Sequence, residues 1–244
     1  PTRRSSDLVL ESTEKTIERP NHPAEEASYF AVDTSQLLSD MQAGKLTVSD
    51  TNWHSVAFGS AFAGTPALLA FMQTKNNERV NIRVRNVGSA GFGIKLDNLE
   101  NDAISNPEVL GWVAISEGVH DLGLKSEFGI IGGFNESRKD ITTTESFVDP
   151  KVFVATINTF IGPDSIYPRG YQSNSDNQIS VRGEETQILS EDQSHGFEVV
   201  SWAAFYTCCY SYNIFQTFCP TGFSKDPRNC TLELSPVFQL TLDQ

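Results

Sequence analysis

The stretch EVLGWVAIS, Glu108 to Ser116, has a near copy later in the chain, EVVSWAAFY, Glu198 to Tyr206. Both copies start with Glu, reach Trp after two apolar residues and a small one, and carry Ala two residues beyond that Trp. The first copy is apolar on both faces of an extended chain, which is typical of a central β-strand. We interpret Trp112 and Trp202 as core residues, because large aromatic side chains are usually buried.

A second pattern recurs in step with this phrase. A Pro and an apolar run precede each copy, from Pro66 to Thr74 and from Pro150 to Thr159, and both runs end in an amide residue followed by Thr. The same elements therefore appear twice in the same order, with longer loops in the second copy. This predicts an internal duplication.

The first copy also contains a clear hairpin pattern. From Arg79 the sequence RVNIRVRNV alternates, with Val80, Ile82 and Val84 on one face. A glycine-containing turn follows, and Phe92, Ile94 and Leu96 then resume the apolar face. Residues 44–48 and 56–58 are predicted to be earlier strands. Short strands separated by turns predict an all-β fold of two tandem antiparallel β-sandwiches.

We divide the chain into four parts. Residues 1–40 are a start plus a linker or the remnant of an upstream module, and the octapeptide PTRRSSDL matches the translation of a common sequencing adapter. Residues 29–42 have a helical spacing of apolar residues. The first sandwich is expected at 41–120, a second and less regular one at 121–209, and a Cys-rich segment at 210–244. The run GIIGGF, residues 129–134, is expected to be a strand edge and turn between the modules.

Composition excludes several classes of partner. The chain has a net charge of −13 and no basic patch with interleaved aromatics, which argues against nucleic acid and anionic membranes. No apolar run approaches the ~18 residues of a spanning helix. Four cysteines, Cys208, Cys209, Cys219 and Cys230, have spacings that favour disulfides over zinc. Together with two Asn-x-Ser/Thr triplets, at Asn135 and Asn229, they favour an extracellular or cell-surface location.

The sequence contains no recognisable catalytic motif. Its four histidines lack metal-ligand spacing, and there is no nucleophile elbow and no phosphate-binding loop. Acidic loops at 97–102 and 184–197 do not fit a calcium-binding loop and are expected to be solvated. We therefore expect no enzyme activity, no cofactor and no metal.

An ordered set of segments resembles the H-type lectin family, which includes snail agglutinins and the C-terminal domain of discoidin. The set contains MQAGKL from Met41, VAFGSAF from Val56, the Pro66 strand, NERVNIRV from Asn77 and GWVAIS from Gly111. The second copy resembles the family only in its Pro strand and EVVSWAAF. The resemblance implies a compact β-sandwich, a tendency to form trimers, and binding of galactose or N-acetylgalactosamine at subunit edges.

The resemblance also suggests which residues bind the ligand. Arg79 stands where the family has a sugar-binding Arg, and Asp50 is the nearest counterpart of an Asp in an earlier loop. The candidate ligand-binding residues are Arg79, Asp50, Asn81, Asn98 and Glu100. Snail agglutinins carry Trp-His where this chain has Leu99-Glu100. A guanidinium can hold vicinal hydroxyls or a carboxylate, so the expected ligand is a galactose-type or an acidic sugar. The alternative is that Arg79 pairs on the surface with Asp97 or Glu100.

These observations lead to two hypotheses of function. The first is a carbohydrate-binding, lectin-like module of an extracellular or cell-surface adhesion protein, without catalysis. The second is a structural or protein-interaction repeat of a surface or matrix protein that has lost sugar binding.

Overall fold

The computed structural model describes residues 32, 37–77, 80–98, 104–122, 125–144, 152–162, 166–172, 177–185 and 196–205. Within these ranges the chain contains strands in four antiparallel sheets and no helix. The predicted all-β class is therefore confirmed. The Cys-rich segment and the start of the chain lie outside the described residues.

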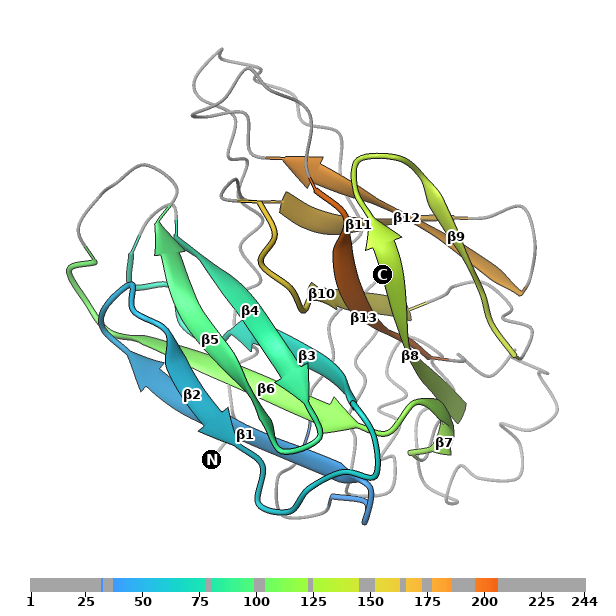
Figure 1. Ribbon diagram of the computed structural model, residues 1–244, viewed down its shortest axis with the longest axis horizontal. Helices are drawn as coiled ribbons and strands as arrows, with labels where there is room; N and C mark the ends of the chain where they lie inside the picture. Colours follow the sequence, from blue (N-terminus) through green and yellow to red (C-terminus); the bar gives the residue numbers. More distant parts are fainter. Residues whose placement is uncertain are drawn as a thin grey trace, which may run out of the picture.

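Six strands of the first module lie within the described residues and are coloured blue to green in Figure 1. They are β1 (Met41–Val48), β2 (His54–Ala57), β3 (Ala67–Met72), β4 (Val80–Gly88), β5 (Gly91–Asn98) and β6 (Glu108–Ile115). One sheet has the order β1-β6-β3, and we call it the first inner sheet. The other has the order β2-β5-β4, and we call it the first outer sheet. The repeated phrase at Glu108 is thus the central strand of its sheet, as predicted.

Seven strands of the second module lie within the described residues and are coloured yellow-green to orange in Figure 1. They are β7 (Gly118–Asp121), β8 (Lys125–Phe134), β9 (Lys139–Thr142), β10 (Val152–Ile157), β11 (Ile166–Gln172), β12 (Gln178–Glu185) and β13 (Glu198–Phe205). The second inner sheet has the order β10-β13-β8-β7, and the second outer sheet has the order β11-β12-β9.

The strand order of the first module recurs in the second. β8, β13 and β10 repeat the arrangement of β1, β6 and β3, and β9, β12 and β11 repeat that of β2, β5 and β4. The register recurs as well, because Trp112 pairs with Gly44 and Trp202 pairs with Gly129. β7 is an additional strand, paired with β8.

Among the described residues, three apolar clusters hold the sheets together. The first module has its own cluster between inner and outer sheets, which includes Leu68, Ile94 and Leu110. The second module has an equivalent cluster around Phe134 and Val181. A third cluster joins the two inner sheets. Each inner sheet is consequently buried on both faces, and each fully buried Leu or Phe contributes about 1.5–3 kcal/mol to folding.

The third cluster uses the same face of each module. It contains Leu69 and Ile115 from the first inner sheet and Phe128 and Phe205 from the second. Ile115 and Phe205 occupy equivalent positions, three residues after the repeated Trp. The sequence of β3, ALLAFM, is apolar throughout because both of its faces are buried. Leu68 faces the cluster of the first module, and Leu69 faces the cluster between the inner sheets.

Side-chain hydroxyls of the second module cap the edge of β3. The backbone N–H of Leu68 donates to Ser201 Oγ at 2.9 Å, and that of Ala70 donates to Thr156 Oγ1 at 3.0 Å. β3 is an edge strand, so these buried donors would otherwise lack sheet partners. The second module therefore satisfies hydrogen bonds that the first module leaves open.

Trp202 lies in the core, as the sequence predicted, whereas Trp112 lies at the margin of its cluster. Trp202 is buried, and Trp112 packs half-buried against the cluster of its own module. Each indole ring lies over a glycine of the neighbouring strand. A Cβ at Gly44 would come within 2.7 Å of Trp112, and one at Gly129 within 2.6 Å of Trp202. The pairing of Trp with Gly is thus a repeated packing unit.

Two local predictions were wrong. Met41 and Gln42, which ended the helical spacing at 29–42, begin strand β1, because their partners Ile115 and Ala114 extend the inner sheet. The run at 129–134 is the second half of β8 and pairs with β13, so it lies inside a sheet rather than between modules. Gly129 in this run leaves room for the Trp202 ring of the neighbouring strand.

Candidate functional site

The candidate residues that the structure describes lie toward one end of the first outer sheet. Asn81 is the second residue of β4, Asn98 is the last residue of β5, and Val80 pairs with Asn98. His54 begins β2 and pairs with Ile94, so the loop before it, which contains Asp50, runs toward the same end. Arg79 and Glu100 lie outside the described residues.

Asp50 is held in a defined orientation. Its Oδ1 atom accepts a hydrogen bond from the backbone N–H of Asn52 at 2.9 Å and lies 2.9 Å from His54 Nε2. The hydrogen bond from His54, followed by that from Asn52, lowers the pKa of the Asp50 carboxyl below its ordinary value of 3.8. The side chain remains 45% exposed. A carboxylate that is ionised, oriented and open to solvent can accept hydrogen bonds from ligand hydroxyls.

The outer face of this sheet is polar, as the alternation predicted. Asn81 Oδ1 accepts a hydrogen bond from the neighbouring N–H of Ile82 at 2.8 Å, and its backbone partner across the sheet is Asp97. Asp97 in turn accepts from Lys95 Nζ at 2.8 Å. Amide and carboxylate groups are therefore adjacent on this face, at the end of the sheet toward which the Asp50 loop runs.

An aromatic ring lies on the same face. Trp53 precedes β2, and the guanidinium of Arg85 stacks on its ring with 4.0 Å to the centroid. Arg85 reaches Trp53 across Gly93, where a Cβ would approach Arg85 Cγ to 3.2 Å. Trp53 also meets Phe160 of the second module edge to face, with 5.5 Å between centroids. The sheet thus combines an aromatic surface with charged and amide groups.

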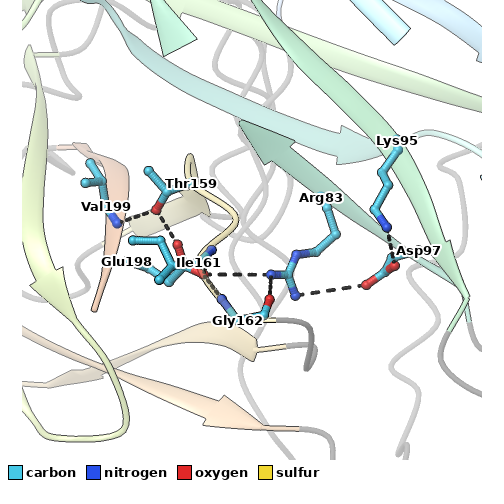
Figure 2. Close-up of polar contacts among 8 residues, drawn as sticks. All are labelled: Arg83, Lys95, Asp97, Thr159, Ile161, Gly162, Glu198 and Val199. Atoms are coloured by element: carbon cyan, nitrogen blue, oxygen red, sulfur yellow. Dashed lines mark hydrogen bonds and ion pairs between the residues drawn. The ribbon is translucent and has the colours of Figure 1, made fainter. Parts of the chain in front are cut away.

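Arg83 joins the two modules, as Figure 2 shows. Its Nη2 atom donates to the backbone carbonyl of Gly162 at 3.0 Å and lies 3.8 Å from Glu198 Oε1. Its Nη1 atom lies 4.0 Å from Asp97, and the guanidinium sits over the ring of Phe160 at 4.6 Å. Only 3% of the side chain is exposed. The second module therefore covers part of the outer face.

The repeated Glu108 and Glu198 fix the loops that follow β3 and β10. Thr74 Oγ1 donates to Glu108 Oε2 at 2.6 Å, and the backbone N–H groups of Asn76 and Asn77 donate to Oε1 at 2.7 Å. Both Glu side chains are fully buried. The Glu108 carboxylate thereby orders the loop of its own module.

Glu198 binds its loop in the same way. Thr159 Oγ1 and the N–H groups of Ile161 and Gly162 donate to its carboxylate. The loop that it orders carries Phe160 and the Gly162 carbonyl to Arg83. One acidic residue in the second module thereby positions the groups that contact the first.

Sequence reasoning missed the cluster of Arg83, Trp53 and Phe160. The alternation of β4 predicts that Arg83 points away from the core, but nothing local indicates that another module covers it. One sequence pattern pointed to the two ordered loops. Thr74 and Thr159 end the two Pro runs and recur in the same order as Glu108 and Glu198. That recurrence marks the two ordered loops.

Neither a metal site nor a membrane-spanning helix occurs among the described residues. No three His, Cys, Asp or Glu side chains there are grouped as metal ligands. No helix in that part of the chain is long and apolar enough to span a bilayer. Comparison with protein-family models, with curated proteins and with solved structures finds no match to this chain.

Proposed function

We propose that this chain is a carbohydrate-binding protein with two tandem sandwiches of the H-type lectin kind, acting outside the cell or at its surface without catalysis. The resemblance of residues 41–118 to that family supports the proposal. The ligand site would lie at the end of the first outer sheet, with Asp50, Asn81 and Asn98 contributed by different segments. Arg79, directly before β4, and Glu100, shortly after β5, would complete it.

The observation that carries the proposal is the ordered, solvent-exposed Asp50 carboxylate in the loop that runs toward the end of the sheet where Asn81 lies. Sugar sites combine a few fixed polar groups with an aromatic surface for the apolar side of the ring. Asp50 supplies a fixed acceptor, Asn81 an amide, and Trp53 an aromatic ring on the same face. The ligand would be a galactose-type sugar or an acidic sugar.

A second candidate function has its own observation. Arg83 on the outer face is 3% exposed because the second module covers it. The fold thus already uses this face for packing between modules. A structural or protein-interaction repeat without a sugar pocket would use it in the same way.

A glycan array distinguishes the two functions. The full chain would be screened beside Asp50→Asn and Arg79→Ala, with Lys45→Ala, an exposed residue of β1, as the control. Asp50→Asn removes the charge but keeps the local turn, because Asn135 makes the same turn with the N–H of Ser137 at 3.0 Å. Selective binding that both site variants lose and Lys45→Ala keeps supports the lectin. A folded wild type that binds no glycan supports the interaction repeat instead.

A further inference from the structure

Three arginines form a row across the outer face of the second outer sheet. Arg169 in β11 pairs with Arg182 in β12. In β9, Lys139 pairs with Val181 in antiparallel register. Extending that register by one residue places Arg138, just before β9, opposite Arg182. Side chains of directly opposed residues project from the same face of a sheet. The three guanidinium groups therefore share one face.

Two carboxylates orient this arginine row. Glu184 accepts from Arg169 at 2.7 Å through one oxygen and from Arg182 at 2.6 Å through the other. Arg138 donates to Ser180 Oγ at 2.6 Å and lies 3.4 Å from Asp140. These contacts hold the guanidinium groups of the row in defined orientations, in a chain whose net charge is −13.

The first module has a row at the same positions. Its members are Trp53, Lys95 and Arg83, because Arg83 pairs with Lys95 and Trp53 precedes the His54–Ile94 pair. Asp97 takes the place of Glu184 and binds Lys95 at 2.8 Å. That row binds oxygen atoms of the second module, the Gly162 carbonyl and the Glu198 carboxylate. In the first module, therefore, the Arg of this row binds oxygen atoms that pack against the outer face of the sheet.

The two rows differ in exposure. In the first module 3% of the Arg83 side chain is exposed, because the loop after β10 covers it. In the second module the side chains of Arg138, Arg182 and Arg169 are 58%, 46% and 43% exposed. The arginine row retains its contacts with Glu184 and Asp140 while presenting guanidinium surface to solvent.

The chemistry of the row also differs from that of its counterpart. In the first module, Trp53 packs edge to face against Phe160. In the second module, Arg138 stands at the position equivalent to Trp53. The loop of the first module carries Lys75 where the loop of the second carries Phe160. If a second copy of the chain docked the loop after β3 onto the arginine row, its Lys75 would lie against three arginines, and the like charges would repel. The substitutions therefore disfavour self-association and favour an anion.

Aligned arginines need a reason, because like charges directly opposite each other destabilise a sheet. We propose that the arginine row binds an anionic group, a sulfate or a carboxylate, carried by an acidic glycan. Planar guanidinium groups bind such oxyanions through paired hydrogen bonds. Tyr167 lies opposite Glu184 on the same face and adds an aromatic ring beside the row. This inference rests on the proposed function only in taking a glycan as the carrier of the charge.

The test measures binding of the full chain to three immobilised polysaccharides. Heparin presents sulfates, polygalacturonate presents carboxylates, and a neutral galactan presents neither. The variants are Arg182→Gln and the double variant Arg138→Gln with Arg182→Gln. Lys125→Gln removes the same charge from an exposed position on β8 and is the matched control. Asp50→Asn reports on the separate site in the first module.

The expected result is salt-sensitive binding to heparin, to polygalacturonate or to both, with none to the galactan through this face. Arg182→Gln should weaken it by about tenfold or more, since charge-assisted hydrogen bonds are lost. The double variant should abolish the binding through this face, and Lys125→Gln should leave it unchanged. Which polymer binds identifies the anion.

Three results would overturn the inference. One is that neither polyanion binds to the folded chain. Another is binding that Arg182→Gln and Lys125→Gln weaken equally, which would indicate attraction by overall charge. The third is self-association in sedimentation that Arg182→Gln removes, without polyanion binding, which would make the row a protein-docking surface. If polyanion binding depends on Arg182 while no array sugar depends on Asp50, the site in the first module fails and the arginine row stands.

Discussion

Arg83 Nη2 in the first module donates a hydrogen bond to the backbone carbonyl of Gly162 in the second, at 3.0 Å. The bond connects an outer-sheet strand to a loop that Glu198 holds in place. Together with the apolar cluster between the inner sheets, it joins the two modules into one body. The modules are therefore expected to unfold together.

The first prediction concerns this bond. Arg83→Ala should lower the free energy of unfolding by about 2–3 kcal/mol, because it removes a buried, charged donor and leaves the Gly162 carbonyl without it. Arg169→Ala, at the equivalent place in the second module, should cost less than about 1 kcal/mol because its ion pair is exposed. Urea denaturation of both variants checks the difference. Equal costs would show that the bond between modules contributes nothing special.

The second prediction concerns Glu108. Glu108→Ala should lower the free energy of unfolding by about 3 kcal/mol or more, because several donors of the loop after β3 lose their acceptor. Glu117→Ala is the control, since Glu117 is exposed and accepts one backbone bond from Ile130. It should cost less than about 1 kcal/mol. Thermal unfolding of the two variants tests this, and a mild effect at Glu108 would contradict its role.

Packing of Trp against Gly gives the third prediction. Gly129→Ala would bring a Cβ to 2.6 Å from the Trp202 ring, and overpacking of this kind costs about 1–3 kcal/mol. Gly132→Ala, three residues along the same strand, meets nothing within 4 Å and should be neutral or slightly stabilising. Denaturation midpoints of the pair decide the matter. If both variants behave alike, the contact with Trp202 does not constrain the strand.

The sequence predicted the parts of the fold that follow from local patterns. The hairpin of β4 and β5 and the central position of β6 follow from alternation and from apolar residues on both faces. β11 was harder to predict because it contains Pro168 and Gly170, which disfavour a strand. It lies at the edge of its sheet, where a missing N–H is tolerated.

The sequence predicted which face of the sheet the candidate side chains project from, but not which residues they contact there. Alternation correctly gave Asn81 and Arg83 an outward orientation. Whether an outward side chain meets solvent or another module depends on contacts between residues far apart in sequence, such as Arg83 with Gly162. Likewise, the hydrogen bond between His54 and Asp50 depends on the turn at Asn52, which the residue types alone did not indicate.

The fourth prediction concerns pH. The pKa of Asp50 is lowered in the folded state, mainly by His54, and that of Asp140 is lowered mainly by Ser180. A lowered folded pKa means that stability from these groups is present above the unfolded value of 3.8 and is lost as the pH falls through the folded value. Carbon NMR titration should find Asp50 below 3.8, and His54→Ala should raise its pKa. An unchanged pKa in that variant would contradict the assigned cause.

The central claim is that a sugar binds at the Asp50 end of the first outer sheet. The most direct measurement is a titration of the isotope-labelled full chain with the tightest-binding array glycan, followed by amide chemical shifts. We predict saturable shifts at Asn52, His54, Asn81 and Asp97, and their loss in Asp50→Asn. Saturable shifts confined to other parts of the chain, or no shifts from any glycan, would contradict the claim.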